Sequence, residues 1–236
     1  MLDSILKSRW RFELSDGSVE GLKWIGLLAM TVDHVNRYLL SPQSLPLYDF
    51  GRIALPIFGV VFAYNLARPG ALSNINRWLR RLLLFGLVAQ FAYLLLERPI
   101  LNVLFTLAVA ATVLWIIETR PSWTGLVWAL AVFGAGGAIV EFRWWGVSYV
   151  VAAYLWCKRR GSADLMLWIA ATALLFAVNR NFYALLAIPI VLIASWQDWH
   201  LPRLRWLFYV YYPAHLLVIS IAARILRSGG TAGGLY

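Results

Sequence analysis

Ionisable side chains occur inside the apolar stretches of this sequence, where burial in a membrane would be costly. The stretch LKWIGLLAMTVDHVNRYLL contains Asp33, His34 and Arg37. A charged side chain at the centre of a membrane helix costs about 2.5–3.5 kcal/mol on insertion scales, so such residues mark functional sites by default. A histidine titrates near neutral pH, which suits a general base, a transient acyl carrier or a proton relay. We therefore take His34 and Asp33 as candidate catalytic residues.

Lys23 lies eleven residues before His34. Eleven helical steps of ~100° return almost to the same side of the helix, and a rise of ~1.5 Å per residue separates the two side chains by ~16 Å along the axis. This geometry suits a long, thin acyl carrier whose phosphates bind near Lys23 while its reactive end reaches His34. The alternative is that Lys23 extends to the membrane interface and His34 hydrogen-bonds a neighbouring helix. Helical spacing also predicts an ion pair between Asp33 and Arg37.

Two other apolar stretches carry polar residues beside a proline. FYVYYPAHLL contains Tyr211, Tyr212 and His215, and we expect His215 to be catalytic and the tyrosines to line a substrate pocket. A Tyr–His hydrogen bond inside a packed bundle is the structural alternative. GRIALPIFG contains Arg52, a candidate donor-binding residue or an interfacial anchor. Its Pro56 removes a backbone hydrogen bond and favours a kink that opens space for a ligand.

The remaining candidates are less specific. Arg77, Arg80 and Arg81 supply charge that attracts phosphate, although membrane topology explains them equally well. Asn102, in NVLFTL, is a pocket candidate together with Arg37, with interhelical packing as the alternative for Asn102. The three histidines lie far apart without a recognised ligand spacing, so no metal site is expected.

The composition indicates the elements that must hold these residues. The chain has 236 residues, of which 61% are hydrophobic and 14% are charged, whereas soluble domains have about 45–50% apolar and about 25% charged residues. Because lipid admits only helices and closed barrels and these apolar runs do not alternate, we predict an all-α, single-domain membrane bundle over residues 1–236, with an interfacial segment at 1–21 and a flexible tail at 228–236. Nine membrane helices are expected, at 22–40, 52–67, 79–96, 100–117, 122–140, 144–157, 164–178, 182–196 and 206–224.

The basic residues predict the orientation of this bundle. Fourteen of the 21 lysines and arginines fall in one set of alternate loops, the set that includes the N-terminus, and this bias favours a cytoplasmic N-terminus. The net charge of +10 is thereby explained by topology, so nucleic acid is not an expected partner and the lipid bilayer is. The single Cys157 permits no internal disulfide.

Four motifs resemble the TraX family of conjugal-transfer membrane proteins: KWIGLLAMTVDHV (Lys23 to Val35), GRIALPIF (Gly51 to Phe58), NVLFTL (Asn102 to Leu107) and FYVYYPAHL (Phe208 to Leu216). They follow the family's order over most of the chain. TraX-like proteins also look like distant members of the transmembrane acyltransferase superfamily, in which a basic residue and a histidine recur on the first helix, as Lys23 and His34 do here. Where the family tends to show an aromatic-acidic-aromatic-Gly segment, this chain has Arg143 to Gly146.

The resemblance implies an acetyltransferase of the bacterial inner membrane, with acetyl-coenzyme A as the cytoplasmic donor. The implied acceptor is a primary amine on the outer side, the N-terminus of a conjugative pilin. In this interpretation His34 is the base or acyl carrier, Asp33 supports it, Lys23 binds phosphate, and His215, Tyr211 and Arg52 form the outer half of the pocket. The competing hypothesis is a proton-coupled transporter of a small solute that uses Asp33, His34 and His215.

Overall fold

The computed structural model describes residues 12–204 and 206–232, which form helices joined by short connections and one isolated bridge. The helices are α2 (Asp16–Leu39), α3 (Leu45–Gly51), α4 (Ala54–Ala67), η1 (Leu72–Asn74), α5 (Ile75–Leu95), α6 (Val103–Thr119), α7 (Trp123–Ile139), α8 (Arg143–Arg159), α9 (Ser162–Leu174), α10 (Phe176–Asn179), η2 (Tyr183–Leu186), α11 (Ala187–Ser195) and α12 (Leu207–Ala232). If α3 is taken with α4, η1 with α5, α9 with α10 and η2 with α11, these residues form nine rods, each at the position of a predicted apolar helix. The all-α prediction is confirmed.

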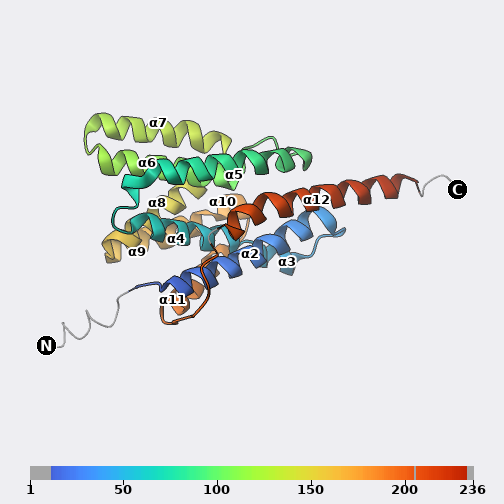
Figure 1. Cartoon of the computed structure of the whole chain (residues 1–236), viewed down its shortest axis with the longest axis horizontal. Helices are drawn as coiled ribbons and strands as arrows, with labels where there is room; N and C mark the ends of the chain where they lie inside the picture. Colours follow the sequence, from blue (N-terminus) through green and yellow to red (C-terminus); the bar gives the residue numbers. More distant parts are fainter. Residues whose placement is uncertain (1–11, 205, 233–236) are drawn as a thin grey trace.

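The rods run along the long axis of the molecule, and the start of α2 and the end of α12 lie at opposite ends of it (Figure 1). Among the described residues, four helical stretches are long and apolar enough to cross a membrane: Leu45–Ala67, Leu72–Leu95, Ser162–Asn179 and Leu207–Ser228. Helix α12 continues to Ala232, past the start of the predicted tail, and residues 1–11 of the predicted interfacial segment lie outside the described residues.

Helix α2 is continuous from Asp16 to Leu39, so it begins six residues before the predicted start at residue 22 and includes the end of the predicted interfacial segment. The Ser15 hydroxyl oxygen accepts a hydrogen bond from the backbone N–H of Ser18 at 3.0 Å, which satisfies one of the free donors of the first turn. At the other end, the Asn36 amide makes two hydrogen bonds to the backbone of Ser44, at 2.7 and 3.0 Å. These bonds fold the connection back, so that α3 packs against α2.

The helical conformation is interrupted between α3 and α4, at Arg52 and Ile53. Pro56 lies in the first turn of α4, where a backbone N–H has no intrahelical partner and its loss costs little. A Cβ on Gly51 would lie 2.5 Å from the Cβ of Asp33, so only glycine permits this close approach to α2. The break therefore places Arg52 beside the polar end of α2.

The main hydrophobic core forms where α4 packs on α8 and α2. Tyr149 on α8 is fully buried, and its hydroxyl donates to the backbone oxygen of Pro56 at 2.6 Å. A Cβ on Gly59 would lie 2.6 Å from the ring of Tyr149. This contact sets the distance between α4 and α8.

We predict that Gly59→Ala destabilises the protein by about 1–3 kcal/mol, because the hydrogen-bonded ring of Tyr149 has no room to retreat. The matched control is Gly134→Ala on α7, where nothing lies within 4 Å of the added Cβ. Thermal unfolding in detergent should show a lower midpoint for Gly59→Ala alone. Equal midpoints for the two variants would contradict this packing.

Candidate functional site

A cavity of about 580 Å³ extends along α2 from Lys23 to His34, between α2, α4, α5, α6 and α12. At one end it is lined by basic residues, here called the basic mouth: Lys23, Arg68, Arg77, Arg81 and Arg203. At the other end lies a group of ionisable residues, here called the polar floor: Asp33, His34, Arg52 and Glu141. Apolar side chains such as Leu27, Phe58 and Leu107 line the wall between them. One cavity thus joins a cationic end to a histidine.

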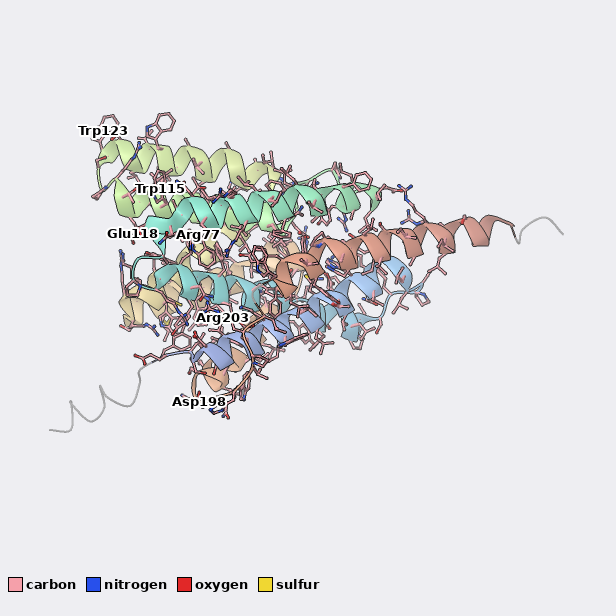
Figure 2. The ribbon with its side chains drawn as sticks, viewed as in Figure 1. Arg77, Trp115, Glu118, Trp123, Asp198 and Arg203 are labelled. Carbon is pink, nitrogen blue, oxygen red and sulfur yellow. The ribbon has the colours of Figure 1, made fainter. Side chains whose placement is uncertain are left out.

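The cations of the basic mouth differ in their partners. Lys23 forms a salt bridge of 2.6 Å with the buried Glu20. Arg68 contacts Asp16 at 2.7 Å, and this hydrogen bond lowers the pKa of Asp16 below its ordinary value. Two of the other arginines, Arg77 on α5 and Arg203 before α12, lie in the same half of the molecule (Figure 2).

The other three arginines of the mouth keep their charge available. Within residues 12–204 and 206–232, no carboxylate lies within salt-bridge distance of Arg77, Arg81 or Arg203. The mouth therefore has unneutralised positive charge, which suits an anionic group such as a phosphate.

On the polar floor, Asp33 forms a salt bridge with Arg52. Arg52 also donates from Nε to the backbone oxygen of Tyr48 at 3.2 Å and stacks over the Tyr48 ring. Only 13% of the Asp33 side chain and 5% of the Arg52 side chain are exposed. The salt-bridge partner of Asp33 is therefore Arg52, not the Arg37 that helical spacing predicts.

The two histidines of the apolar stretches meet. His34 Nδ1 lies 2.8 Å from His215 Nε2, and His215 Nδ1 lies 3.0 Å from the backbone oxygen of Tyr211. A carbonyl oxygen only accepts, so His215 Nδ1 must donate, and in a neutral ring its Nε2 then accepts. His34 Nδ1 must therefore be the donor between the rings, which leaves Nε2 of a neutral His34 with a free lone pair. His34 is the ring of this pair that lines the cavity.

Tyr211 holds this histidine pair in place. The Thr31 hydroxyl donates to the backbone oxygen of Leu27 at 2.8 Å, so its oxygen accepts from the Tyr211 hydroxyl, which lies 2.9 Å away. The Tyr211 ring stacks on His215 with 5.0 Å between centroids. Helices α2 and α12 are thus joined by two side-chain hydrogen bonds, one turn apart on α12.

Most of the predicted site residues line the one cavity: Lys23, Asp33, His34, Arg52, Arg77, Arg81, Tyr211 and Tyr212. Four others do not. His215 lies behind His34, and the side chain of Arg80 is exposed outside the cavity. Asn102 is buried and donates to the backbone oxygen of Gly86 at 2.8 Å, which joins α5 to α6. Arg37 lies near Glu141 without lining the cavity.

The structure bears differently on the roles predicted for Arg52 and Asp33. Arg52, predicted both as a donor-binding residue and as part of the outer half of the pocket, lies on the polar floor, paired with Asp33 and away from the basic mouth. Asp33 was expected to support His34, but the hydrogen-bond partner of the His34 ring is His215. Asp33 and His34 are sequence neighbours, and consecutive side chains on a helix point about 100° apart.

Two charged residues of this site are not predicted by the sequence: Arg203 at the basic mouth and Glu141 on the polar floor. Glu141 lies in the turn between α7 and α8, two residues before the segment Arg143 to Gly146 in which the family pattern places an acid. The only signal was a single acid between two apolar runs, and such a residue is also typical of a helix end.

Comparison with known proteins identifies relatives of this chain. The profile of the family described as "TraX protein" matches residues 18–223. The chain is 33% identical over 147 residues to "Protein TraX" of Escherichia coli, and the alignment covers 60% of this chain and 54% of that protein. This chain thus spans about half the length of that Escherichia coli relative. It is also 29% identical over 251 residues to "Probable fimbrial assembly protein FimC, serogroup H1" of Dichelobacter nodosus, covering 90% of this chain and 98% of that protein. No solved structure matches.

The Asp33–Arg52 pair generates a stability prediction. Removing one partner leaves the other buried and uncompensated, which costs about 3–5 kcal/mol. We therefore expect Asp33→Asn and Arg52→Gln each to lower the unfolding temperature in detergent strongly. The double variant should be more stable than the sum of the two losses predicts. Additive losses would show that the two side chains do not interact.

Proposed function

Because this chain belongs to the TraX family, we propose that it is an acetyltransferase of the bacterial inner membrane. It moves an acetyl group from cytoplasmic acetyl-coenzyme A to a primary amine at the outer side of the membrane, the N-terminus of a pilin. The observation that carries this proposal is the single cavity that joins the basic mouth to His34. The name of the Dichelobacter relative, a probable fimbrial assembly protein, supports a pilin as the acceptor.

The donor is expected to bind with its nucleotide phosphates at the basic mouth. Arg77, Arg81 and Arg203 offer charges that no carboxylate neutralises among the described residues, and guanidinium groups bind phosphate in a bidentate manner. The narrow pantetheine arm then follows α2 past apolar side chains for the ~16 Å that separate Lys23 from His34. The thioester is delivered to the polar floor, where the apolar wall restricts water that would hydrolyse it.

His34 is the residue that moves protons in this proposal. Its Nε2 lone pair takes a proton from the nitrogen of the acceptor as that nitrogen forms a bond to the thioester carbonyl carbon. The C–S bond then breaks, and the proton passes from His34 to the departing thiolate, so that amide and free thiol are the products. Alternatively, Nε2 attacks the carbonyl carbon and the C–S bond breaks to release the thiolate; the amine then takes the acetyl group from Nε2, and the proton that the amine loses passes to the thiolate. In both routes His215 accepts from Nδ1 and keeps the ring in the required tautomer.

The position of the basic mouth agrees with the expected orientation. The mouth lies toward the end of the bundle where α2 starts (Figure 2), and the distribution of lysine and arginine predicts that this end faces the cytoplasm, where acetyl-coenzyme A is made. The polar floor lies toward the opposite end, so the acceptor approaches from the outer side. The enzyme would in this way transfer only the acetyl group between two aqueous compartments.

We expect His34→Ala to lower acetyl transfer by about 10²–10⁴-fold while the protein still folds and binds coenzyme A, because the general base is lost but the mouth is intact. The assay uses purified protein, labelled acetyl-coenzyme A and a synthetic pilin N-terminal peptide, with a coenzyme A thermal shift as the control. Absence of transfer, donor hydrolysis and thermal shift in the wild-type protein would exclude the enzyme. Solute flux in vesicles that His34→Ala abolishes would instead support a transporter.

A second prediction concerns the basic mouth. The double variant Arg77→Gln/Arg81→Gln should raise the KM for acetyl-coenzyme A about tenfold or more and leave kcat nearly unchanged, because it weakens phosphate binding far from the reacting atoms. Arg120→Gln is the matched control, since Arg120 is exposed at a helix end outside the cavity. A change in kcat alone would place these arginines near the chemistry instead.

A further inference from the structure

We infer that the turn between α7 and α8 forms the binding site for the charged amine of the acceptor, with Glu141 as the carboxylate that holds it. The inference rests on the proposed acetyl transfer and adds the recognition of the acceptor to it. It is argued from the geometry of the turn, the surroundings of the carboxylate and the charge of the ligand.

The turn is fixed at an unusual backbone conformation. Phe142 and Arg143 both have positive φ, 61° and 50°, a region that costs non-glycine residues of order 1–3 kcal/mol. The backbone N–H of Glu141 donates to the Leu101 oxygen at 2.7 Å, and the Leu101 N–H donates to the Ile139 oxygen at 2.9 Å. The Thr106 hydroxyl donates to the backbone oxygen of Glu141. The connection before α6 and the first turns of α6 therefore hold the strained turn and direct Glu141 to the cavity.

The same contacts explain the motif NVLFTL. Asn102 caps α6 by accepting from the backbone N–H of Leu104, and Thr106 follows one turn later. A Cβ on Gly146 would lie 2.6 Å from the Cβ of Phe142 and 3.2 Å from a methyl carbon of Thr106, so the turn packs directly on this helix. Asn102 and Thr106 are positioning residues for Glu141 rather than contacts of a substrate.

The Glu141 carboxylate has capacity for a cation. The phenol of Tyr93 lies beside it, and Arg37, Arg98 and Asp33 are the charged groups that face it. Within the described part of the chain, no lysine or arginine lies within salt-bridge distance of Glu141. Even if the phenol donates to it, the carboxylate retains free acceptor positions.

The other acid of the polar floor is already engaged. Asp33 is in direct contact with Arg52, whose Nε donates to the backbone oxygen of Tyr48. Glu141 is consequently the acid of this cavity that remains free to bind an incoming ammonium group. A charged ligand entering an apolar bundle needs such a counter-charge, since an unpaired buried charge is strongly disfavoured.

This assignment completes the proton balance of the proposed reaction. A primary amine arrives as an ammonium ion and must lose one proton before its nitrogen can attack the thioester. Glu141 binds the ammonium and accepts that first proton, which it releases to solvent after the product leaves. The second proton leaves the nitrogen during attack and passes through His34 to the thiolate, so one proton is released in each turnover.

The test compares Glu141→Gln with the wild-type protein on two probes, a synthetic peptide with a free α-amine and hydroxylamine. The peptide amine is charged at neutral pH, whereas hydroxylamine is mostly uncharged. We expect the KM for the peptide to rise about tenfold or more, and the KM for acetyl-coenzyme A and the rate with hydroxylamine to stay unchanged. Thr106→Val, which removes the hydroxyl that fixes the turn, should raise the peptide KM in the same direction.

The matched control is Glu97→Gln, an exposed acid outside the cavity that pairs with Arg227. A peptide KM that is unchanged in Glu141→Gln, or an equal loss with both probes, would overturn the assignment of Glu141 while the transferase stands. A wild-type protein that acetylates neither probe would overturn the proposed function itself. The two failures are therefore distinguishable in one set of measurements.

Discussion

The hydrogen bond between His34 and His215 is the interaction on which the rest of the site depends. It joins α2 to α12 across 181 residues of sequence and lies deep in an apolar bundle, where an unpaired ring nitrogen would be costly. Because His215 is committed to the backbone of Tyr211, the proton between the rings has one allowed position. A contact needed for stability thus also determines which nitrogen of His34 is basic. The packing of the two histidines therefore fixes the His34 tautomer that the proposed acetyl transfer requires.

The separation of charge along the cavity follows from the same constraint. At the basic mouth, solvent hydrates the arginines, so the chain can leave several of them without a carboxylate. On the polar floor, the charges of Asp33 and Arg52 compensate each other directly. The cavity therefore has net positive charge at the mouth, where the proposed anionic donor enters, and on the floor a cancelled Asp33–Arg52 pair beside the free carboxylate of Glu141. This gradient favours one direction of binding for the proposed donor.

The sequence predicted what depends on local periodicity and missed what depends on contacts distant in the chain. Hydropathy located the nine rods, and helical geometry placed Lys23 and His34 on one wall, because both properties are determined within one helix. The partner of Asp33 was predicted wrongly because Arg37 is near in sequence, whereas Arg52 comes close only through the break before α4. The meeting of His34 with His215 required the packing of the first rod on the last. Spacing along one chain segment contains no information on such contacts.

Glu141 shows why polar residues outside helices are the hardest to interpret from sequence. Its position follows from a turn whose conformation is unfavourable at both Phe142 and Arg143 and persists because Thr106 and Leu101 hold its backbone. A chain that only needed to reverse direction at this point could use glycine at such positions and avoid the strain. Bulky residues with positive φ, held from a second helix, are therefore better explained by what the turn presents than by the connection it makes. In this cavity it presents a carboxylate to the site where, in the proposed reaction, the acceptor amine loses a proton.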